Sequence, residues 1–333
     1  MSIPGRLGVL LVQLGGPENR EQLKPFLYEL FVDPEILGIP FVPLRKLVAW
    51  TIATARVPKS REIYERIGWS PIRRWSEAQA RLLEELLAAR TMPTMPGAPS
   101  PAVRVGMTCS APFVETALEG LRAAGATRLL VLPLYPQYSV TTTRGSFNRV
   151  THALARMGWA PERRNAPDAW YEEPGFVAAH VARILTAAAT LPDPDPARTV
   201  VLYSAHSLPV KTVERQKDPY PRHIEETVRI LDAALEGRYR SRLGYQSKVG
   251  PVEWLGPSTP EVLAELAKAG EKQVLVVPIA FVSDHVETLY EIRLLFGGEA
   301  ARLGIPHYVV AEGLNDHPEF IRGLADVVEK AAA

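Results

Sequence analysis

Short runs of apolar, mostly β-branched residues alternate along the chain with longer stretches in which apolar residues recur at helical spacing. The short runs predict strands that are buried on both faces of a sheet, at residues 7–14, 103–107, 128–134, 199–204, 274–277 and 307–310. The longer stretches predict helices, near residues 20–31, 59–67, 76–90, 112–124, 144–157, 175–189, 220–235, 260–269 and 318–330. Strands that alternate with helices in this way indicate an α/β fold with parallel sheets.

The second half of the chain repeats the pattern of the first. Residues 118–134, LEGLRAAGATRLLVLPL, align without gaps with residues 263–279, LAELAKAGEKQVLVVPI, and seven of the seventeen positions are identical. The opening strand VLLVQLGGP likewise has a counterpart in VVLYSAHSLP. We therefore expect two similar Rossmann-like lobes, residues 1–165 and 166–315, each with a parallel sheet covered by helices on both faces. The helix in residues 316–333 is expected to pack on the first lobe, and the strand exits to face each other across a central cleft.

Polar residues gather directly after the strand at 274–277, in the string SDHVE. Asp284, Glu287 and Glu291 are spaced i, i+3 and i+7, which places them on one face of a helix. Open α/β sheets bind ligands beyond the carboxyl ends of their strands, and His206 also follows a strand, in AHSLP. A histidine and carboxylates at such exits suit proton transfer or metal handling. The alternative is structural, because Asp284 and Glu287 also resemble a capping box, although a cap does not require His206 opposite it.

Residues 38–57, GIPFVPLRKLVAWTIATARV, are apolar and interrupted by prolines, and only Arg45, Lys46 and Arg56 are charged. One interpretation is a buried segment packed under a loop. The other is an exposed apolar lip over a pocket, or a shallow membrane contact with basic anchors. The lip residues would be Phe41, Val42, Leu44, Leu47 and Trp50.

The composition narrows the class of protein. Of the 333 residues, 47% are hydrophobic and 23% are charged, and the formal net charge of +1 gives no electrostatic case for binding nucleic acid. The single cysteine, Cys109, excludes a disulfide framework and a CxxC metal site, and it fits a reducing cytoplasm. No signal peptide is expected, because the N-terminal stretch lacks a long apolar core with a cleavage site. No apolar run is long enough for a transmembrane helix, so we expect a cytoplasmic protein.

Seven strings of the sequence resemble the ferrochelatases, the enzymes that insert ferrous iron into a porphyrin to make haem. They are LVQLGGPE, PKSREIYERIGWSPI, YPQYSVTTT, YSAHSLP, DPYP, YQSKVGPVEWLGP and VPIAFVSDHVETLYE. The resemblance runs from about Val9 to near the C-terminus, and several of the strings are long and spaced as in that family. It implies the two-lobed fold of the class II chelatases, a lyase activity and a place at the last step of haem biosynthesis.

The resemblance also implies roles for individual residues. His206 matches the catalytic histidine of the family, Glu287 matches its partner acid across the pocket, and both are expected to meet the metal. Asp284 matches a nearby family acid, and Glu291 begins an acidic path that leads away from the site. That path is shorter here, because Leu295 stands where relatives carry another acid. The residues expected to bind the porphyrin are Leu14, Arg56, Tyr64, Tyr138 and Trp254.

Departures from the family pattern bear on substrate and cofactor. Leu14 stands where the coproporphyrin-using subgroup has a tyrosine beside the metal, and protoporphyrin-using relatives have an apolar residue there. The expected substrates are therefore protoporphyrin IX and Fe²⁺, and the expected product is protohaem. Thr108 and Cys109 replace an Arg-Tyr pair of animal relatives, and the cysteines of the animal cluster are missing. No iron–sulfur cluster or other cofactor is expected. A monomer is favoured, with at most weak peripheral contact to a membrane.

Metal insertion requires the two pyrrolic N–H protons to leave and the nitrogen lone pairs to turn out of the ring plane. His206 suits proton acceptance near neutral pH, and Glu287 can relay the proton or bind the metal; the sequence leaves open which of them meets the metal first. A coproporphyrin ferrochelatase or a cobalt chelatase of the same fold are enzymatic alternatives, because metal choice depends on ligand geometry. An alternative of another class is a non-catalytic tetrapyrrole or metal carrier, which would need the pocket but not His206 and Glu287 together.

Overall fold

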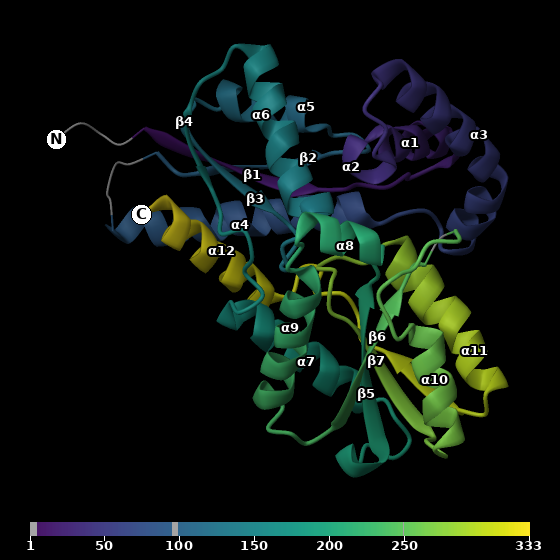
Figure 1. Cartoon of the computed structure of the whole chain (residues 1–333). Helices are drawn as coiled ribbons and strands as arrows, with labels where there is room; N and C mark the ends of the chain where they lie inside the picture. Colours follow the sequence, from purple (N-terminus) through teal and green to yellow (C-terminus); the bar gives the residue numbers. More distant parts are fainter. Residues whose placement is uncertain (1–4, 95–98, 249) are drawn as a thin grey trace. The chain divides into compact units, whose positions relative to one another are not determined.

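The computed structural model describes residues 5–94, 99–248 and 250–333. These residues form two compact units, and Figure 1 labels most of their helices and strands. The first unit comprises the chain up to Tyr135 together with Val140–Asp168 and Ile321–Ala333, and the second comprises Pro136–Ser139 and Ala169–Phe320. The sequence predicted the main boundary between residues 165 and 166. In the structure, the chain leaves the first unit after Asp168.

The first unit contains a four-stranded parallel sheet in the order β2 (Ala102–Met107), β1 (Arg6–Gln13), β3 (Ala126–Pro133) and β4 (Glu162–Asn165). Helices α5 (Val114–Ala123) and α6 (Gly145–Met157) cover one face, where their apolar side chains join those of β1 and β3. Helix α4 (Ile72–Thr94) packs along β2 and β1. From Ile321 on, α12 (Pro318–Ala332) belongs to this unit, and Asp326 there pairs with Arg90 of α4 at 2.6 Å.

Three further helices of the first unit are α1 (Arg20–Val32), α2 (Pro34–Leu37) and α3 (Val42–Arg66), and α1 packs along α3 (Figure 1). The sequence predicted a helix over residues 59–67 only, whereas α3 is continuous from Val42 and contains Pro58. Pro43 fits the first turn of α3, because the N–H of that position has no partner within a helix. The side chains of Phe41 and Leu47 are 65% and 61% exposed. The interpretation of residues 38–57 as a buried segment is therefore wrong.

The second unit contains a four-stranded parallel sheet in the order β6 (Arg240–Gln246), β5 (Thr199–His206), β7 (Gln273–Pro278) and β8 (His307–Val310). Alternate residues of β5 and β7 point to opposite faces. One set packs with α7 (Pro174–Ala188) and α9 (Tyr220–Ala234). The other set packs with α10 (Thr259–Lys268), the π-helix η3 (Glu287–Leu295) and α11 (Phe296–Arg302). The shorter elements are η1 (Val140–Arg144), η2 (Pro196–Arg198) and α8 (Val210–Gln216).

The two units repeat one topology, because each sheet places its first strand between its second and third. Gly106 in β2 and Gly244 in β6 occupy equivalent places. A Cβ atom on either glycine would lie 2.9 Å from a helix backbone, at Val114 in α5 or at Thr259 in α10. The repeated glycine allows the following helix to approach the sheet closely. The predicted α/β fold with two similar parallel-sheet units is confirmed.

Two strands were not predicted, the edge strands β4 and β6. Their sequences, ERRN and RSRLGYQ, lack a continuous apolar run because edge strands need not be buried on both faces. Within the described part of the chain, no helix combines the length and the apolar character that a membrane span requires.

Candidate active site

His206 is the last residue of β5, an inner strand of the second sheet. It lies opposite Gln246 in the parallel pair of β5 with β6. Its carbonyl oxygen accepts a hydrogen bond from the hydroxyl of Tyr220 at 3.0 Å, and the next residue, Ser207, donates its N–H to the carbonyl of Gln246 at 2.9 Å. The sheet therefore fixes the backbone of His206 and leaves its side chain, 34% exposed, at the carboxyl end of the strand.

The side chains of His206 and Glu287 are in direct contact, with 2.9 Å between Nδ1 and Oε2. Glu287 is the first residue of η3, which begins nine residues after β7 ends. The same oxygen, Oε2, also accepts hydrogen bonds from Nε2 of Gln246 at 3.2 Å and from Oγ of Ser247 at 2.9 Å. The ends of β5 and β6 thus supply the donors to a single carboxylate oxygen at the start of η3.

The protonation state of this pair follows from its surroundings. Burial alone would raise the pKa of Glu287, but His206, His285 and the Ser247 hydroxyl outweigh it and lower the pKa to about 2. Glu287 is therefore ionised at neutral pH and can only accept hydrogen bonds, so Nδ1 of His206 carries the proton. In neutral His206 the lone pair is consequently on Nε2, which is the atom able to accept a proton or bind a metal.

The charge of Glu287 also acts on His206. Burial disfavours the imidazolium form, but the carboxylates of Glu287 and Glu291 outweigh this cost and raise the pKa of His206 above its ordinary value. The carboxylate therefore stabilises the cation that forms when Nε2 accepts a proton. The arrangement is that of a general base with an orienting acid behind it.

Ser247 links Glu287 to Glu291. Its Oγ is 2.9 Å from Oε2 of Glu287 and 2.6 Å from Oε2 of Glu291, and its N–H donates to Oε1 of Glu291 at 2.8 Å. Burial raises the pKa of Glu291, and the charge of Glu287 raises it further. One hydroxyl proton can serve only one carboxylate at a time, so a protonated Glu291 would donate to Ser247 while Ser247 donates to Glu287. Leu295, four residues beyond Glu291, is apolar and 48% exposed, so it does not extend the predicted acidic path.

The sequence analysis missed Gln246, whose amide is held by buried hydroxyl groups. Its Oε1 accepts a hydrogen bond from Oγ of Ser204 at 2.6 Å. Oγ of Ser204 is in turn 3.0 Å from Oγ1 of Thr259. Because Oε1 faces Ser204, the amide NH₂ group of Gln246 faces Glu287. No local signal marked Gln246, because it ends an edge strand that lacks a continuous apolar run.

Two further residues that the sequence analysis did not single out lie beside the pair. Nδ1 of His285 is 3.0 Å from the carbonyl oxygen of Ser283, so it donates, and Nε2 of His285 is 3.9 Å from Oε1 of Glu287. The ring of Phe281 has its centroid 4.3 Å from that of His285 and 6.2 Å from that of His206, in edge-to-face arrangements. Phe281 is therefore in ring contact with both histidines.

Asp284 is not part of this hydrogen-bonded group. One of its carboxylate oxygens accepts from Oγ1 of Thr288 at 2.8 Å, and the other accepts from Nδ2 of Asn315 at 2.8 Å. Asp284 therefore fixes the loop before η3 and does not extend the acidic path. The capping-box alternative is also wrong for Glu287, because the helix starts at that residue and its carboxylate contacts His206.

Two expected substrate-binding residues, Trp254 and Tyr138, belong to the same unit as His206. The segment that carries Trp254 pairs with the segment following His206: Val210 donates to the carbonyl of Glu253, and Pro209 bridges to Trp254. The indole Nε1 of Trp254 is buried and has no hydrogen-bond partner among the described residues. Tyr138 is bound through its backbone N–H, which donates to Nδ1 of His223 at 3.3 Å.

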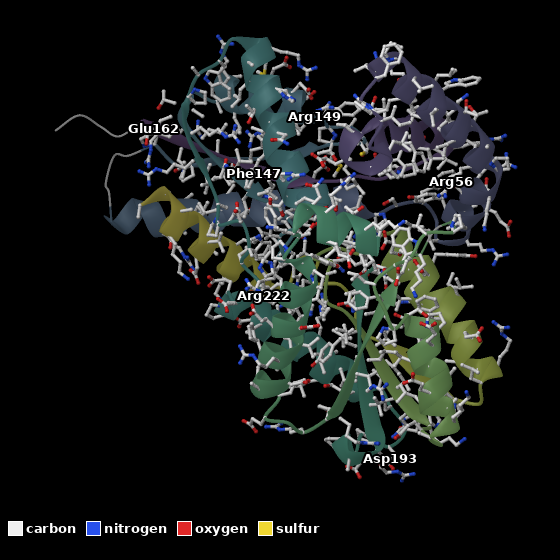
Figure 2. All side chains as sticks on the ribbon, viewed as in Figure 1. Arg56, Phe147, Arg149, Glu162, Asp193 and Arg222 are labelled. Carbon is white, nitrogen blue, oxygen red and sulfur yellow. The ribbon has the colours of Figure 1, made fainter. Side chains whose placement is uncertain are left out.

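The other three expected residues, Leu14, Arg56 and Tyr64, belong to the first unit. Leu14 directly follows β1 and is half-buried. Arg56 is exposed on α3 (Figure 2), with its guanidinium 5.2 Å from the centroid of the Phe31 ring. Tyr64 is only 5% exposed and is stacked on Trp69, with 6.1 Å between ring centroids. Contact of these three residues with a porphyrin stays a prediction.

His206 and Glu287 were expected to face each other across a gap that would hold a metal or the edge of a macrocycle. The hydrogen bond between them closes that gap, so this expectation is wrong. Among the described residues, no group of three or more His, Cys, Asp or Glu side chains is placed to hold a metal ion. The two atoms of the pair that face away from the hydrogen bond, Nε2 of His206 and Oε1 of Glu287, are the ones available to a ligand.

Comparisons with known proteins point to one family over nearly the whole chain. The family model described as Ferrochelatase matches residues 6–332. A ferrochelatase of Gloeobacter violaceus is 41% identical over 324 residues, which cover 97% of this chain and 96% of the relative. A ferrochelatase of Synechococcus elongatus is 42% identical over 331 residues, covering 98% of this chain and 82% of the relative.

Solved structures with a similar fold are chelatases. The structure of SirB from Bacillus subtilis with Fe³⁺ superposes with a TM-score of 0.56 at 13% identity, covering 98% of this chain and 96% of that one. The sirohydrochlorin chelatase SirB from Bacillus subtilis subspecies spizizenii in complex with cobalt gives a TM-score of 0.53 at 14% identity, with the same coverage. At this identity the likeness concerns the fold alone.

Proposed function

Since the chain belongs to the ferrochelatase family, we propose that it is a lyase that inserts Fe²⁺ into protoporphyrin IX and releases two protons. His206 acts as the base and Glu287 as the acid that orients it. The single observation that supports these roles is the hydrogen bond of 2.9 Å between Nδ1 and Oε2. That bond leaves the lone pair of His206 on Nε2, at the carboxyl end of a parallel strand where α/β sheets bind ligands.

The chemistry follows from these groups. Two N–H bonds of the free-base porphyrin break, the four ring nitrogens bind the metal, and the charge of Fe²⁺ balances the two negative charges of the deprotonated ring. Nε2 of His206 accepts one proton, and the carboxylate of Glu287 stabilises the resulting imidazolium. His206 must release that proton from Nε2 to water before it accepts the second, while Nδ1 keeps its own proton in the hydrogen bond to Glu287. Positioned proton transfer of this kind typically contributes about 10²- to 10⁴-fold in rate.

Iron is a substrate in this proposal, and no resident cofactor takes part. Nε2 of His206 and Oε1 of Glu287 are the proposed contacts for the incoming ion, and imidazole suits iron better than carboxylate does. The one cysteine of the chain, Cys109, is buried, and burial raises the pKa of its thiol to about 12. It therefore stays a thiol at neutral pH, whereas ligation of an iron–sulfur cluster requires several thiolates.

The porphyrin is proposed to contact Leu14, Arg56, Tyr64, Tyr138 and Trp254. Leu14 supports protoporphyrin as the substrate, because an apolar side chain favours the less polar macrocycle. Arg56 supports binding of a propionate, because its guanidinium is exposed and can form a charge-assisted hydrogen bond. Trp254 adds an apolar face close to the segment that follows His206.

Anaerobic absorbance assays test this function with Fe²⁺ or Co²⁺ and with protoporphyrin or coproporphyrin. We expect turnover with Fe²⁺ and protoporphyrin, and a loss of about 10²- to 10⁴-fold in His206→Ala. The matched control is His152→Ala, since His152 is exposed on α6 of the first unit. Near-normal metallation by a folded His206→Ala variant would refute the role of the base. Stoichiometric binding of porphyrin without turnover would identify a carrier, and faster turnover of coproporphyrin would refute the argument from Leu14.

The protein is further proposed to act as a cytoplasmic monomer with weak peripheral contact to membranes. The support is the exposed start of α3, where Leu47 and Trp50 are 61% and 52% exposed beside Arg45 and Lys46. Co-sedimentation with anionic lipid vesicles should fall in Leu47→Ser. It should be unchanged in Leu185→Ser, which removes a leucine that is 40% exposed on α7. Equal sedimentation of both variants and the wild type would contradict the membrane contact.

A further inference from the structure

Four residues, Pro136–Ser139, belong to the second unit although the residues on either side belong to the first. This segment, here called the strap, is bound to the second unit through each of its residues. The carbonyl of Pro136 accepts from the N–H of Trp170 at 2.8 Å. Nε2 of Gln137 donates to Oγ1 of Thr227 and to the carbonyl of Ile279, and Oγ of Ser139 donates to Oδ2 of Asp218.

The remaining anchor of the strap is the side chain of His223. The backbone N–H of Tyr138 donates to Nδ1 of His223 over 3.3 Å. An N–H group can only donate, so Nδ1 must carry the lone pair and the proton of the neutral ring must be on Nε2. When the imidazole is protonated, both nitrogens become donors. The bond to Tyr138 can therefore exist only while His223 is neutral.

Charged and aromatic groups surround His223, which lies on α9 and is 8% exposed. The ring of Tyr171 has its centroid 4.9 Å from that of His223, and its hydroxyl donates to Glu226. Burial lowers the pKa of His223, and the neighbouring Arg222, labelled in Figure 2, lowers it further. The acids that oppose this shift are Glu226, Asp218 and Glu172. The balance lowers the pKa of His223 below its ordinary value of 6.5, so the ring is neutral at pH 7.

The strap also lies next to the elements of the candidate active site. Gln137 binds the carbonyl of Ile279, which follows β7 and precedes Phe281 by two residues. The ring of Phe281 in turn contacts the ring of His206, with 6.2 Å between centroids. Tyr138, a proposed porphyrin contact, is thus the neighbour in sequence of Gln137, which is hydrogen-bonded to the start of the loop that leads to Glu287.

We propose that His223, in its neutral form, is a positioning residue that anchors the strap and holds Tyr138 for porphyrin binding, and that protonation of His223 releases this anchor. The part that concerns porphyrin rests on the proposed function, because the contact of Tyr138 with the macrocycle belongs to it. The anchor itself rests only on the hydrogen bond between Tyr138 and His223. Affinity for porphyrin should consequently weaken as the solution becomes mildly acidic.

Two variants of the full chain test the anchor. His223→Asn places a non-titrating amide oxygen near the position of Nδ1, and His223→Leu removes the acceptor. At pH 7.5 we expect KM for protoporphyrin to be near normal in the Asn variant and roughly 3- to 10-fold higher in the Leu variant, the size of one lost neutral hydrogen bond. The kcat of both variants should be close to the wild-type value, because His206 and Glu287 are unchanged.

The pH dependence separates positioning from a general structural role. As the pH is lowered from 7.5 through the range in which His223 becomes protonated, the wild-type KM should rise more steeply than that of His223→Asn, and the ratio of the two should approach the roughly 3- to 10-fold loss expected of His223→Leu. Parallel profiles for the wild type and His223→Asn would overturn the proposal. If His223→Leu does not fold, the comparison with His223→Asn is sufficient.

Hydrogen exchange of the ligand-free protein provides a readout that does not need activity. Amide exchange is measured in the peptide that contains Tyr138 and is corrected for the intrinsic pH dependence of exchange. The corrected exchange should be faster at pH 5.5 than at pH 7.5 in the wild type, and it should be unchanged in His223→Asn. Equal protection in both proteins at pH 5.5 would overturn the anchor, even if the protein metallates porphyrin. A protein that metallates no porphyrin would refute the proposed function, while the exchange result would still decide whether His223 anchors the strap.

Discussion

Replacing Glu287 with Gln is the most informative change at the candidate active site. The substitution keeps the shape of the side chain but removes its charge, while His206, Gln246 and Ser247 all direct their hydrogen bonds to Oε2. Without the carboxylate, burial becomes the dominant influence on His206, and the pKa of His206 falls. A Gln amide can also turn its NH₂ group toward Nδ1, which would move the ring proton to Nε2 and block proton acceptance there.

The size of the effect follows from the hydrogen bond that is changed. A charge-assisted bond is worth about 1.5–3 kcal/mol and a neutral one about 0.5–1.5 kcal/mol. The difference of roughly 1–1.5 kcal/mol corresponds to about one pKa unit at His206. Tautomer reversal adds to this, and in serine proteases the analogous Asp→Asn change costs about 10⁴-fold. We therefore expect kcat/KM at pH 7 to fall by roughly 10²- to 10⁴-fold in Glu287→Gln.

The assay is the pH profile of kcat/KM for anaerobic metallation. The wild-type rate should fall as pH decreases below the raised pKa of His206, because the base becomes protonated. In Glu287→Gln the remaining activity should persist to a pH about one unit lower. A Glu287→Gln variant with the wild-type rate and the wild-type acid limb would refute the proposed pairing.

The same pair predicts how stability depends on pH. The pKa of His206 is raised in the folded protein, so its contribution is complete below its ordinary value of 6.5 and is lost as pH rises through the folded pKa. The pKa of Glu287 is lowered to about 2, so its contribution is present above its ordinary value of 4.5 and is lost as pH falls toward 2. The difference in Tm between the wild type and Glu287→Gln should be largest between these two ordinary values.

Three further changes test neighbouring conclusions. Gln246→Leu removes a donor to Glu287 and should lower kcat about 3- to 10-fold with little change in KM, the size of one hydrogen bond. Arg56→Ala should raise KM for protoporphyrin more than it lowers kcat, whereas Arg66→Ala, which removes another exposed arginine of α3, should change neither. His180 is buried and burial lowers its pKa to about 3, so wild-type stability should fall as pH drops below 6.5. Urea unfolding of His180→Leu should show a smaller loss between pH 7 and pH 4.5.

Local patterns in the sequence determined most of the fold. The inner strands β1, β3, β5 and β7 are buried on both faces, so each appears as a continuous apolar run. The edge strand β6 was missed because Arg240 and Arg242 interrupt its apolar pattern. That omission removed Gln246 from the predicted site.

Helix α3 shows a second limit of local patterns. The prolines of residues 38–57 were interpreted as interruptions, but Pro43 lies in the first turn of the helix, and Pro58, just beyond that stretch, is accommodated within it. The helix packs along α1, and Ala49 and Ala53 of α3 are buried. Tertiary contacts of this kind commonly override local preference.

The sequence by itself determined that His206 and Glu287 each lie close to the carboxyl end of a buried strand, because strand runs and their exits are visible in consecutive residues. Only the tertiary structure decided that the two side chains touch, that Gln246 and Ser247 share the same carboxylate oxygen, and that Asp284 is bound elsewhere. The reason is the spacing of the partners: His206 and Glu287 are 81 residues apart, and Gln246 and Glu287 are 41 apart. Hydrogen bonds over such separations depend on strand order and register, which a local pattern does not contain.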